Sequence, residues 1–192
     1  MDQQAIEDAI QAILLGHVDD YSIIVKQYQQ QLLQYVRYLV DGKGDVEDIV
    51  QEVFIRIYQN LDKYQQGTSF NNWVYRITYN HTMTVLKKQN RNRLLLLGKI
   101  PETNHPSVSS TEMSNETRKA LSKLTIEERN LIYLRVYEEL SYKKIAEIQE
   151  SSDATLRKKF ERARKKFIKA YRKEVEENEN RRTEDTNIEL CK

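Results

Sequence analysis

Apolar side chains recur every three or four residues over most of this chain, and that spacing fits α-helices and little else. Over residues 19–41 the apolar stripe consists of Tyr21, Ile24, Val25, Tyr28, Leu32, Tyr35, Val36 and Leu39. Residues 46–61 repeat the pattern with Val46, Ile49, Val50, Val53, Phe54, Ile57 and Leu61. Only five glycines and two prolines occur in 192 residues, which is too few turn residues for a sheet protein. The sequence therefore predicts an all-α protein.

A break in these stripes predicts two small helical domains joined by a flexible linker. Both prolines, Pro101 and Pro106, fall together with four serines in residues 98–114. Near the end of the chain, apolar residues become rare, which predicts a charged, disordered tail. The expected first domain, linker, second domain and tail occupy residues 1–95, 96–117, 118–173 and 174–192.

Charged side chains are unevenly distributed, although the formal net charge is only +2. Residues 1–60 carry 4 Lys/Arg and 10 Asp/Glu, whereas residues 61–98 carry 6 and 1, and residues 118–173 carry 17 and 8. Two basic regions on separate domains suggest that the chain grips a polyanion at two places.

Several function classes are excluded by what the sequence lacks. The three histidines are scattered, the single cysteine is Cys191, and no metal-binding, phosphate-loop or nucleophile motif occurs. We therefore expect no catalysis, no cofactor and no metal.

No run approaches the roughly 18 apolar residues of a membrane span, and the N-terminus does not resemble a signal peptide. We expect a cytoplasmic protein with no direct membrane insertion.

The second domain has the pattern of a helix-turn-helix. Thr125 and Glu128 match a capping box, and Ser141 and Ser152 can cap a short helix and then a strongly basic one. Ten Lys/Arg in residues 155–173 fit phosphates, although a solvated face is the alternative. Facing away from the apolar seam are Thr155, Arg157, Lys158, Glu161, Arg162 and Lys165. Because the first turns of such a helix meet the bases, Arg157, Lys158, Glu161 and Arg162 are the candidates for reading DNA.

A helix predicted from about residue 70 to 90 combines rings, amides and positive charge on one face. Its core side contains Phe70, Trp73, Val74, Ile77 and His81. The opposite side contains Asn72, Tyr75, Arg76, Tyr79, Met83 and Lys87, with Asn80 at the edge. Rings stack on unpaired bases and amides bond to base edges, so this face suits single-stranded nucleic acid. The alternative is that the tyrosines pack on a neighbouring helix.

The helix predicted over residues 46–61 also has a second face, which is acidic. Along it lie Asp48, Gln51, Glu52 and Ile55, at the spacing of one helical face. A carboxylate-rich row does not hold DNA, but it can dock a protein partner that carries basic residues. A solvated face is again the alternative.

Two long runs resemble one known family. The run DVEDIVQEVFIRIYQNLDKYQQGTSFNNWVYRITYNH resembles region 2 of the extracytoplasmic-function (ECF) sigma factors of the sigma-70 family. The run LTIEERNLIYLRVYEELSYKKIAEIQESSDATLRKKFERARKKF resembles their region 4. The resemblance implies a subunit that binds core RNA polymerase, recognises −35 and −10 promoter elements and promotes melting. It also implies an anti-sigma factor as a partner, with a membrane-bound one among the options.

The resemblance assigns roles to particular residues. Those implied to meet the clamp helices of the largest polymerase subunit are Asp48, Gln51, Glu52 and Ile55. Those implied to hold the −10 element and its everted base are Lys63, Ser69, Asn72, Tyr75, Arg76, Tyr79, Asn80, Met83 and Lys87. Those implied to contact the −35 duplex are Arg135, Thr155, Arg157, Lys158, Glu161, Arg162 and Lys165.

The chain departs from the family pattern in the turn of the helix-turn-helix. Glu150 and Ser151 stand where the family has a glycine and an aliphatic residue, and Ala154 replaces a frequent glycine. Glutamate is costlier than glycine in a left-handed conformation, so the turn geometry is open.

The main alternative function is a stand-alone helix-turn-helix regulator. This alternative gives no role to the acidic row on residues 46–61 or to the face of the next helix that carries Tyr75 and Tyr79, called here the tyrosine face. A further alternative is a helical adaptor that binds only proteins.

Overall fold

The computed structural model describes residues 3–40, 45–95 and 114–190, and within the last two ranges it describes side chains as far as residues 91 and 179. Every regular element in these ranges is helical, and they contain no strand. The all-α prediction is therefore confirmed. The expected linker lies mostly outside the described residues, as does Cys191.

Eleven helical elements follow one another along the described residues. Those of the first domain are α1 (Gln3–Leu14), η1 (Val18–Asp20), α2 (Tyr21–Val40), α3 (Val46–Gln59), η2 (Leu61–Lys63) and α4 (Phe70–Leu95). Those of the second domain are α5 (Asn115–Ser122), α6 (Ile126–Ile132), the π-helical turn η3 (Tyr133–Tyr137), α7 (Tyr142–Gln149) and α8 (Asp153–Leu190).

Polar caps fix where the helices begin, as the sequence predicts. The Asp45 side chain accepts a hydrogen bond from the Asp48 N–H at 3.2 Å and starts α3. Thr125 and Glu128 form a complete capping box at the start of α6. The Ser141 side chain caps α7. Each cap satisfies a backbone donor that would otherwise have no intrahelical partner.

The first domain has its own apolar core between α1, α2, α3 and α4. It contains the predicted stripes, for example Ile24, Leu32, Val53 and Ile57, all fully buried. Trp73 belongs to this core, where its ring stacks on Phe70 and the centroids are 5.4 Å apart. Core packing therefore explains the only tryptophan, in agreement with the interpretation of that side of the helix.

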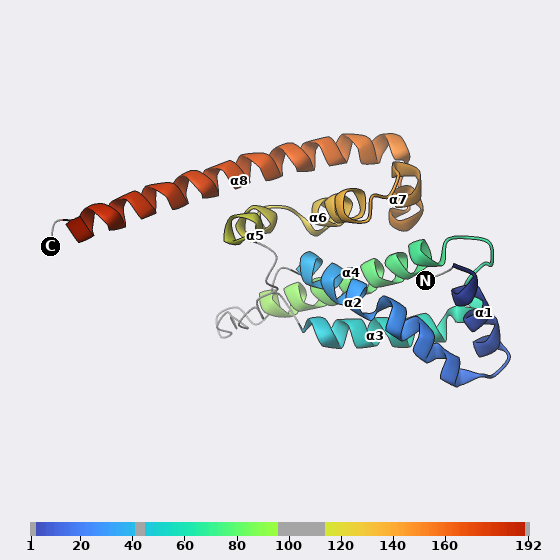
Figure 1. Ribbon diagram of the computed structural model, residues 1–192. Helices are drawn as coiled ribbons and strands as arrows, with labels where there is room; N and C mark the ends of the chain where they lie inside the picture. Colours follow the sequence, from blue (N-terminus) through green and yellow to red (C-terminus); the bar gives the residue numbers. More distant parts are fainter. Residues whose placement is uncertain (1–2, 41–44, 96–113, 191–192) are drawn as a thin grey trace.

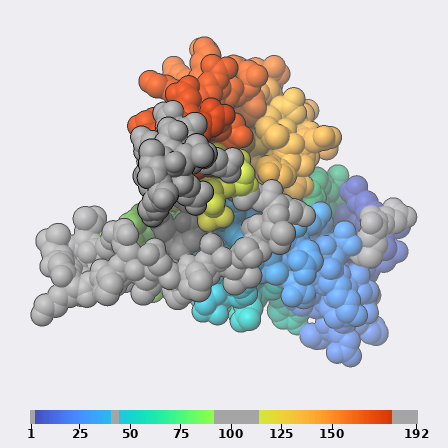
Figure 2. All heavy atoms as spheres, turned by 60° about the vertical axis from the view of Figure 1, so that its left-hand side comes forward, coloured from blue at the N-terminus to red at the C-terminus, as the bar shows by residue number. Residues whose placement is uncertain are grey.

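A second apolar cluster joins the two domains. It combines Tyr35, Tyr38, Leu39 and Tyr75 from α2 and α4 with side chains of the second domain: Leu121, Leu124, Leu131, Tyr133, Leu134, Leu140, Ile145, Ile148 and Leu156. Figure 1 shows α5, α6 and α7 lying over α2 and α4, with α8 outermost. In Figure 2 the yellow and orange segments of the second domain rest directly on the blue and green segments of the first. The domains thus pack against each other, which the sequence does not predict.

Helix α8 continues to Leu190, past residue 174, where the charged tail is predicted to begin. Contacts with α5 account for part of this extension. Lys119 Nζ lies 3.1 Å from Glu174 Oε2, and the Asn178 amide donates a hydrogen bond to Glu116. Polar contacts of this kind with a neighbouring helix cannot be inferred from the low apolar content on which the tail prediction is based.

Candidate polymerase and nucleic-acid interfaces

The acidic row on α3 is open to solvent. Asp48, Gln51 and Glu52 are exposed, and Ile55 retains 55% of its accessible surface. The opposite face of α3 is buried in the first core, through side chains such as Val53. The structure therefore brings the four predicted residues together on one solvent-exposed face.

One member of the acidic row has a partner in the core. Glu52 Oε2 lies 3.0 Å from Nε2 of His81, a residue of α4 that is almost fully buried. Burial lowers the pKa of His81, and Arg56 lowers it further, while Glu52 opposes both effects. The imidazole is thus held toward its neutral form beneath the acidic row.

The tyrosine face of α4, which consists of the residues of this helix predicted to meet the −10 strand, is partly covered. Ser69 caps this helix, with its Oγ 3.3 Å from the Asn72 N–H. Asn72 retains 7% of its accessible surface and Tyr75 retains none. The other predicted residues of α4 are half-buried or exposed: Arg76, Tyr79 and Met83 are half-buried, whereas Asn80 and Lys87 are exposed. Two of the predicted −10 contacts are therefore inaccessible in this arrangement.

Rings and amides from both domains make the cover. The Tyr35 ring packs edge-on against Tyr75 and is tilted against Tyr133, with both pairs of centroids 4.9 Å apart. The Tyr35 hydroxyl donates a hydrogen bond to Asn130 Oδ1 at 2.5 Å. Asn72 Nδ2 donates to Glu147 Oε2 at 3.3 Å. The alternative of tyrosines packing on neighbouring helices thus describes Tyr75 in this arrangement.

The covering surface also carries carboxylates. Burial raises the pKa of Tyr79 to about 12, with a further contribution from Glu127. Burial raises the pKa of Tyr75, and Glu138 raises it further. The carboxylates of Glu127, Glu138 and Glu147 therefore bring negative charge to a face that is predicted to meet nucleic acid.

The loop before α4 is tied to α1. The Tyr64 hydroxyl oxygen lies 2.6 Å from Glu7 Oε1 and 2.7 Å from the Thr68 carbonyl oxygen, and its single proton can be donated to either acceptor. The predicted contact Lys63 is exposed, and its Nζ lies 2.7 Å from Asn60 Oδ1. Sequence reasoning missed the role of Glu7, because 57 residues separate it from Tyr64 and no local pattern links them.

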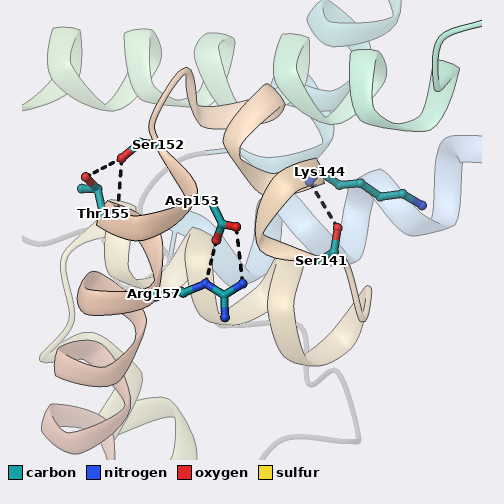
Figure 3. Close-up of polar contacts among 6 residues, drawn as sticks. All are labelled: Ser141, Lys144, Ser152, Asp153, Thr155 and Arg157. Carbon is teal, nitrogen blue, oxygen red and sulfur yellow. Dashed lines mark hydrogen bonds and ion pairs between the residues drawn. The ribbon is translucent and has the colours of Figure 1, made fainter.

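Helix α8 of the second domain begins after a three-residue turn. Glu150 adopts the left-handed conformation with φ 49°, which a glycine adopts at lower cost. Ser152 Oγ accepts from the Thr155 N–H at 3.3 Å and caps α8 (Figure 3). The seam residues Leu156 and Ala163 are fully buried. The predicted DNA-facing residues of this helix are all exposed: Thr155, Arg157, Lys158, Glu161, Arg162 and Lys165.

Two predicted DNA contacts share one aromatic ring. The Cζ atoms of Arg157 and Arg135 lie 4.9 and 5.3 Å from the ring centroid of Tyr142. Asp153 also holds Arg157, through an Nε–Oδ1 distance of 2.9 Å and an Nη2–Oδ2 distance of 3.3 Å (Figure 3). Arg135 Nη1 donates to the Leu140 carbonyl at 3.3 Å. The sequence analysis singled out neither Tyr142 nor Asp153 for a role at the interface.

Other kinds of site find no support in the described part of the chain. Its side chains form no group of three or more metal-ligating residues. None of its helices has the length and apolarity needed to cross a membrane.

Comparison with known proteins identifies both domains. Residues 24–92 match the family model for sigma-70 region 2, and residues 114–167 match the model for sigma-70 region 4. The Bacillus subtilis ECF RNA polymerase sigma factor SigW is 27% identical over 187 residues, which cover 88% of this chain and 98% of SigW. The ECF RNA polymerase sigma-E factor of Escherichia coli is 28% identical over 169 residues, which cover 81% of this chain and 88% of that protein.

Two solved structures share the fold. One is the sigma factor RpoE of Bartonella quintana in complex with the anti-sigma factor NepR, with a TM-score of 0.68, 21% identity, and 80% of this chain and 97% of RpoE covered. The other is CnrH in complex with the cytosolic domain of CnrY, with a TM-score of 0.63, 22% identity, and 87% and 94% covered. Matches to sigma factors over both domains favour this class over a stand-alone regulator. The chain belongs to the sigma-70 family, and within it to the ECF sigma factors of RNA polymerase.

Proposed function

We propose that this sigma factor engages its partners in a fixed order, with core polymerase first and the −10 strand later. One observation carries the proposal: the acidic row on α3 is exposed, while Asn72 and Tyr75 on the tyrosine face of α4 are buried against the second domain. A surface that is already open can bind before one that must be uncovered.

The first contact in this scheme is between α3 and the clamp helices of the largest polymerase subunit. Asp48, Gln51 and Glu52 offer an acidic patch with Ile55 as its apolar edge. Complementary charge on a partner speeds encounter and fixes register. The contact of Glu52 with His81 supports this role, because it restrains one carboxylate of the patch.

The second contact is between α4 and the unpaired −10 strand. Tyr75 and Asn72 can reach a base only after the second domain has moved away, because both are buried beneath it. Opening about ten base pairs costs roughly 14 kcal/mol at roughly 1.4 kcal/mol per step. Each stacked base returns only about 1–3 kcal/mol. The chain therefore melts a promoter only together with the polymerase.

The contact between the first turns of α8 and the −35 duplex needs no uncovering, so it can form before the −10 contact. The exposed basic side chains of this helix can face a major groove without any rearrangement within the second domain.

The chain acts through binding and has no catalytic role of its own, and it works in the bacterial cytoplasm. Because the similar RpoE and CnrH structures contain NepR and CnrY, we include an anti-sigma factor among the partners.

Run-off transcription with purified bacterial core enzyme tests the proposal. Asp48→Lys should weaken binding to core and reduce transcription, because it reverses a charge in the middle of the patch. Glu47→Lys is the matched control: it makes the same charge change one residue earlier, where Glu47 is paired with Arg37 at 3.4 Å. Equal effects of the two variants on affinity for core would refute docking through this row. A specific footprint made without polymerase would favour the stand-alone regulator.

A further inference from the structure

The guanidinium of Arg157 is held from two directions, although it lies on the exposed side of α8. Below it is the Tyr142 ring, with Cζ 4.9 Å from the centroid. Beside it is Asp153, one turn earlier in the same helix, which engages Nε and Nη2. An exposed arginine that is free to rotate loses substantial side-chain entropy on binding, and these contacts remove part of that cost in advance.

The choice of donors by Asp153 decides what Arg157 can offer to a ligand. A guanidinium has five N–H groups, and Asp153 takes the Nε–H and one N–H of Nη2. What remains is the outer edge, formed by Nη1 and the second N–H of Nη2. These two nitrogens present parallel donors, which match the O6 and N7 acceptors of guanine in the major groove.

Tyr142 is itself fixed in place, so it can act as a platform. It follows the Ser141 cap of α7, its ring packs edge-on against Phe160 with centroids 6.0 Å apart, and Arg135 lies near the same ring. The platform therefore links α7, α8 and the turn before α7.

We infer that Tyr142 and Asp153 are positioning residues for −35 recognition, and that the Arg157 they hold reads one guanine through its outer edge. The inference rests on the proposed function, because it assumes that α8 enters the −35 major groove. It goes further by naming the base and by giving roles to two residues outside the DNA-contacting set.

Asp153 also has an effect that a purely structural residue lacks. Its carboxylate lies at the DNA-facing start of α8, where it repels phosphates. Loss of this charge should strengthen binding to non-specific duplex and steepen its salt dependence. The same change should weaken discrimination for guanine, because the Arg157 side chain is no longer held. Opposite effects on affinity and on specificity are thus the signature of this role.

The test uses holoenzyme and promoters in which each −35 position is varied in turn. For the wild type we expect one position where guanine is preferred about 5- to 150-fold, the range for a good bidentate contact. Arg157→Ala should abolish this preference. Asp153→Asn and Tyr142→Leu should each reduce it several-fold and leave the other positions unchanged. Tyr142→Phe, which keeps the ring, should retain it.

Two controls separate positioning from loss of structure. Glu150→Gln removes an equal charge three residues before Asp153, from a side chain with no contact to Arg157 among those described, and should leave the base preference unchanged. Melting temperatures of all variants report whether the second domain is intact.

The possible results have distinct meanings. A wild-type holoenzyme with no base preference at any −35 position would refute the proposed function itself. A wild-type preference that is insensitive to Asp153→Asn and Tyr142→Leu would overturn this inference alone. A uniform loss at every position would also overturn it, because it would show that the two residues only maintain the fold.

Discussion

Removal of one hydroxyl group should loosen the contact between the two domains. In Tyr35→Phe the ring remains and can keep its contacts with Tyr75 and Tyr133, but the hydrogen bond to Asn130 Oδ1 is lost. Asn130 is fully buried, and its Nδ2 already lacks a partner among the described residues. A buried acceptor left without a donor costs about 1–3 kcal/mol. That penalty disappears when the domains separate and water reaches Asn130.

This energetic penalty can be converted into a change in the populations of closed molecules, whose two domains are packed together, and open molecules, whose domains are separated. A penalty of about 1–3 kcal/mol shifts the ratio of closed to open molecules by about 5- to 150-fold. Fluorophores on cysteines introduced at Gln30 of α2 and Lys169 of α8, in a Cys191→Ser background, should report lower energy transfer for Tyr35→Phe. The apparent affinity for single-stranded −10 DNA should rise by a similar factor until most molecules are open.

A double variant provides the control. In Tyr35→Phe/Asn130→Leu both polar partners are replaced by apolar groups of similar shape, a change that is often nearly neutral. The closed form should therefore recover. If Tyr35→Phe leaves energy transfer unchanged, or if the double variant is as open as the single one, the hydrogen bond does not help to hold the domains together.

Three further predictions concern stability. Because the pKa of His81 is lowered in the folded chain, the stability that its neutral imidazole contributes is fully present above the unfolded pKa of about 6.5 and is lost as the pH falls below that value. His81→Gln should therefore reduce the difference between the free energies of unfolding measured in urea at pH 7.5 and at pH 5.5. Glu150→Gly should raise the free energy of unfolding by up to about 1 kcal/mol in thermal melts, whereas Glu150→Ala should not, because only glycine relieves the left-handed strain. Thr125→Ala should cost about 1 kcal/mol by removing one half of the capping box, and Thr125→Ser should retain most of it, as measured by chemical denaturation.

Local features of the fold follow from the sequence, whereas long-range ones do not. The caps at Asp45, Thr125 and Ser141 were predictable because each acts within four residues of itself. The hydrogen bond between Tyr35 and Asn130 joins residues 95 positions apart, and no periodicity indicates it.

For the candidate interfaces too, local features could be predicted from the sequence and long-range contacts could not. The spacing of polar and apolar residues identified the faces of α3, α4 and α8, because burial of one side of a helix leaves the other side defined. It did not reveal that the tyrosine face is covered, since a ring can stack on a base or on another ring equally well. It also did not reveal Tyr142, whose partners Arg135 and Arg157 belong to other helical elements, η3 and α8, so no pattern along one helix links them.

The apolar character of the contact between the two domains predicts how the closed form responds to ionic strength. Counterion release makes the grip of a basic protein on phosphates weaken steeply as salt is added. The cover is held mainly by buried rings and apolar side chains, and screening by salt hardly affects such contacts. Added salt therefore weakens the nucleic-acid competitor while the cover keeps its strength. When the ion concentration in a cell rises, a larger fraction of this protein should therefore be in the closed form, with its predicted strand-binding residues covered by the second domain.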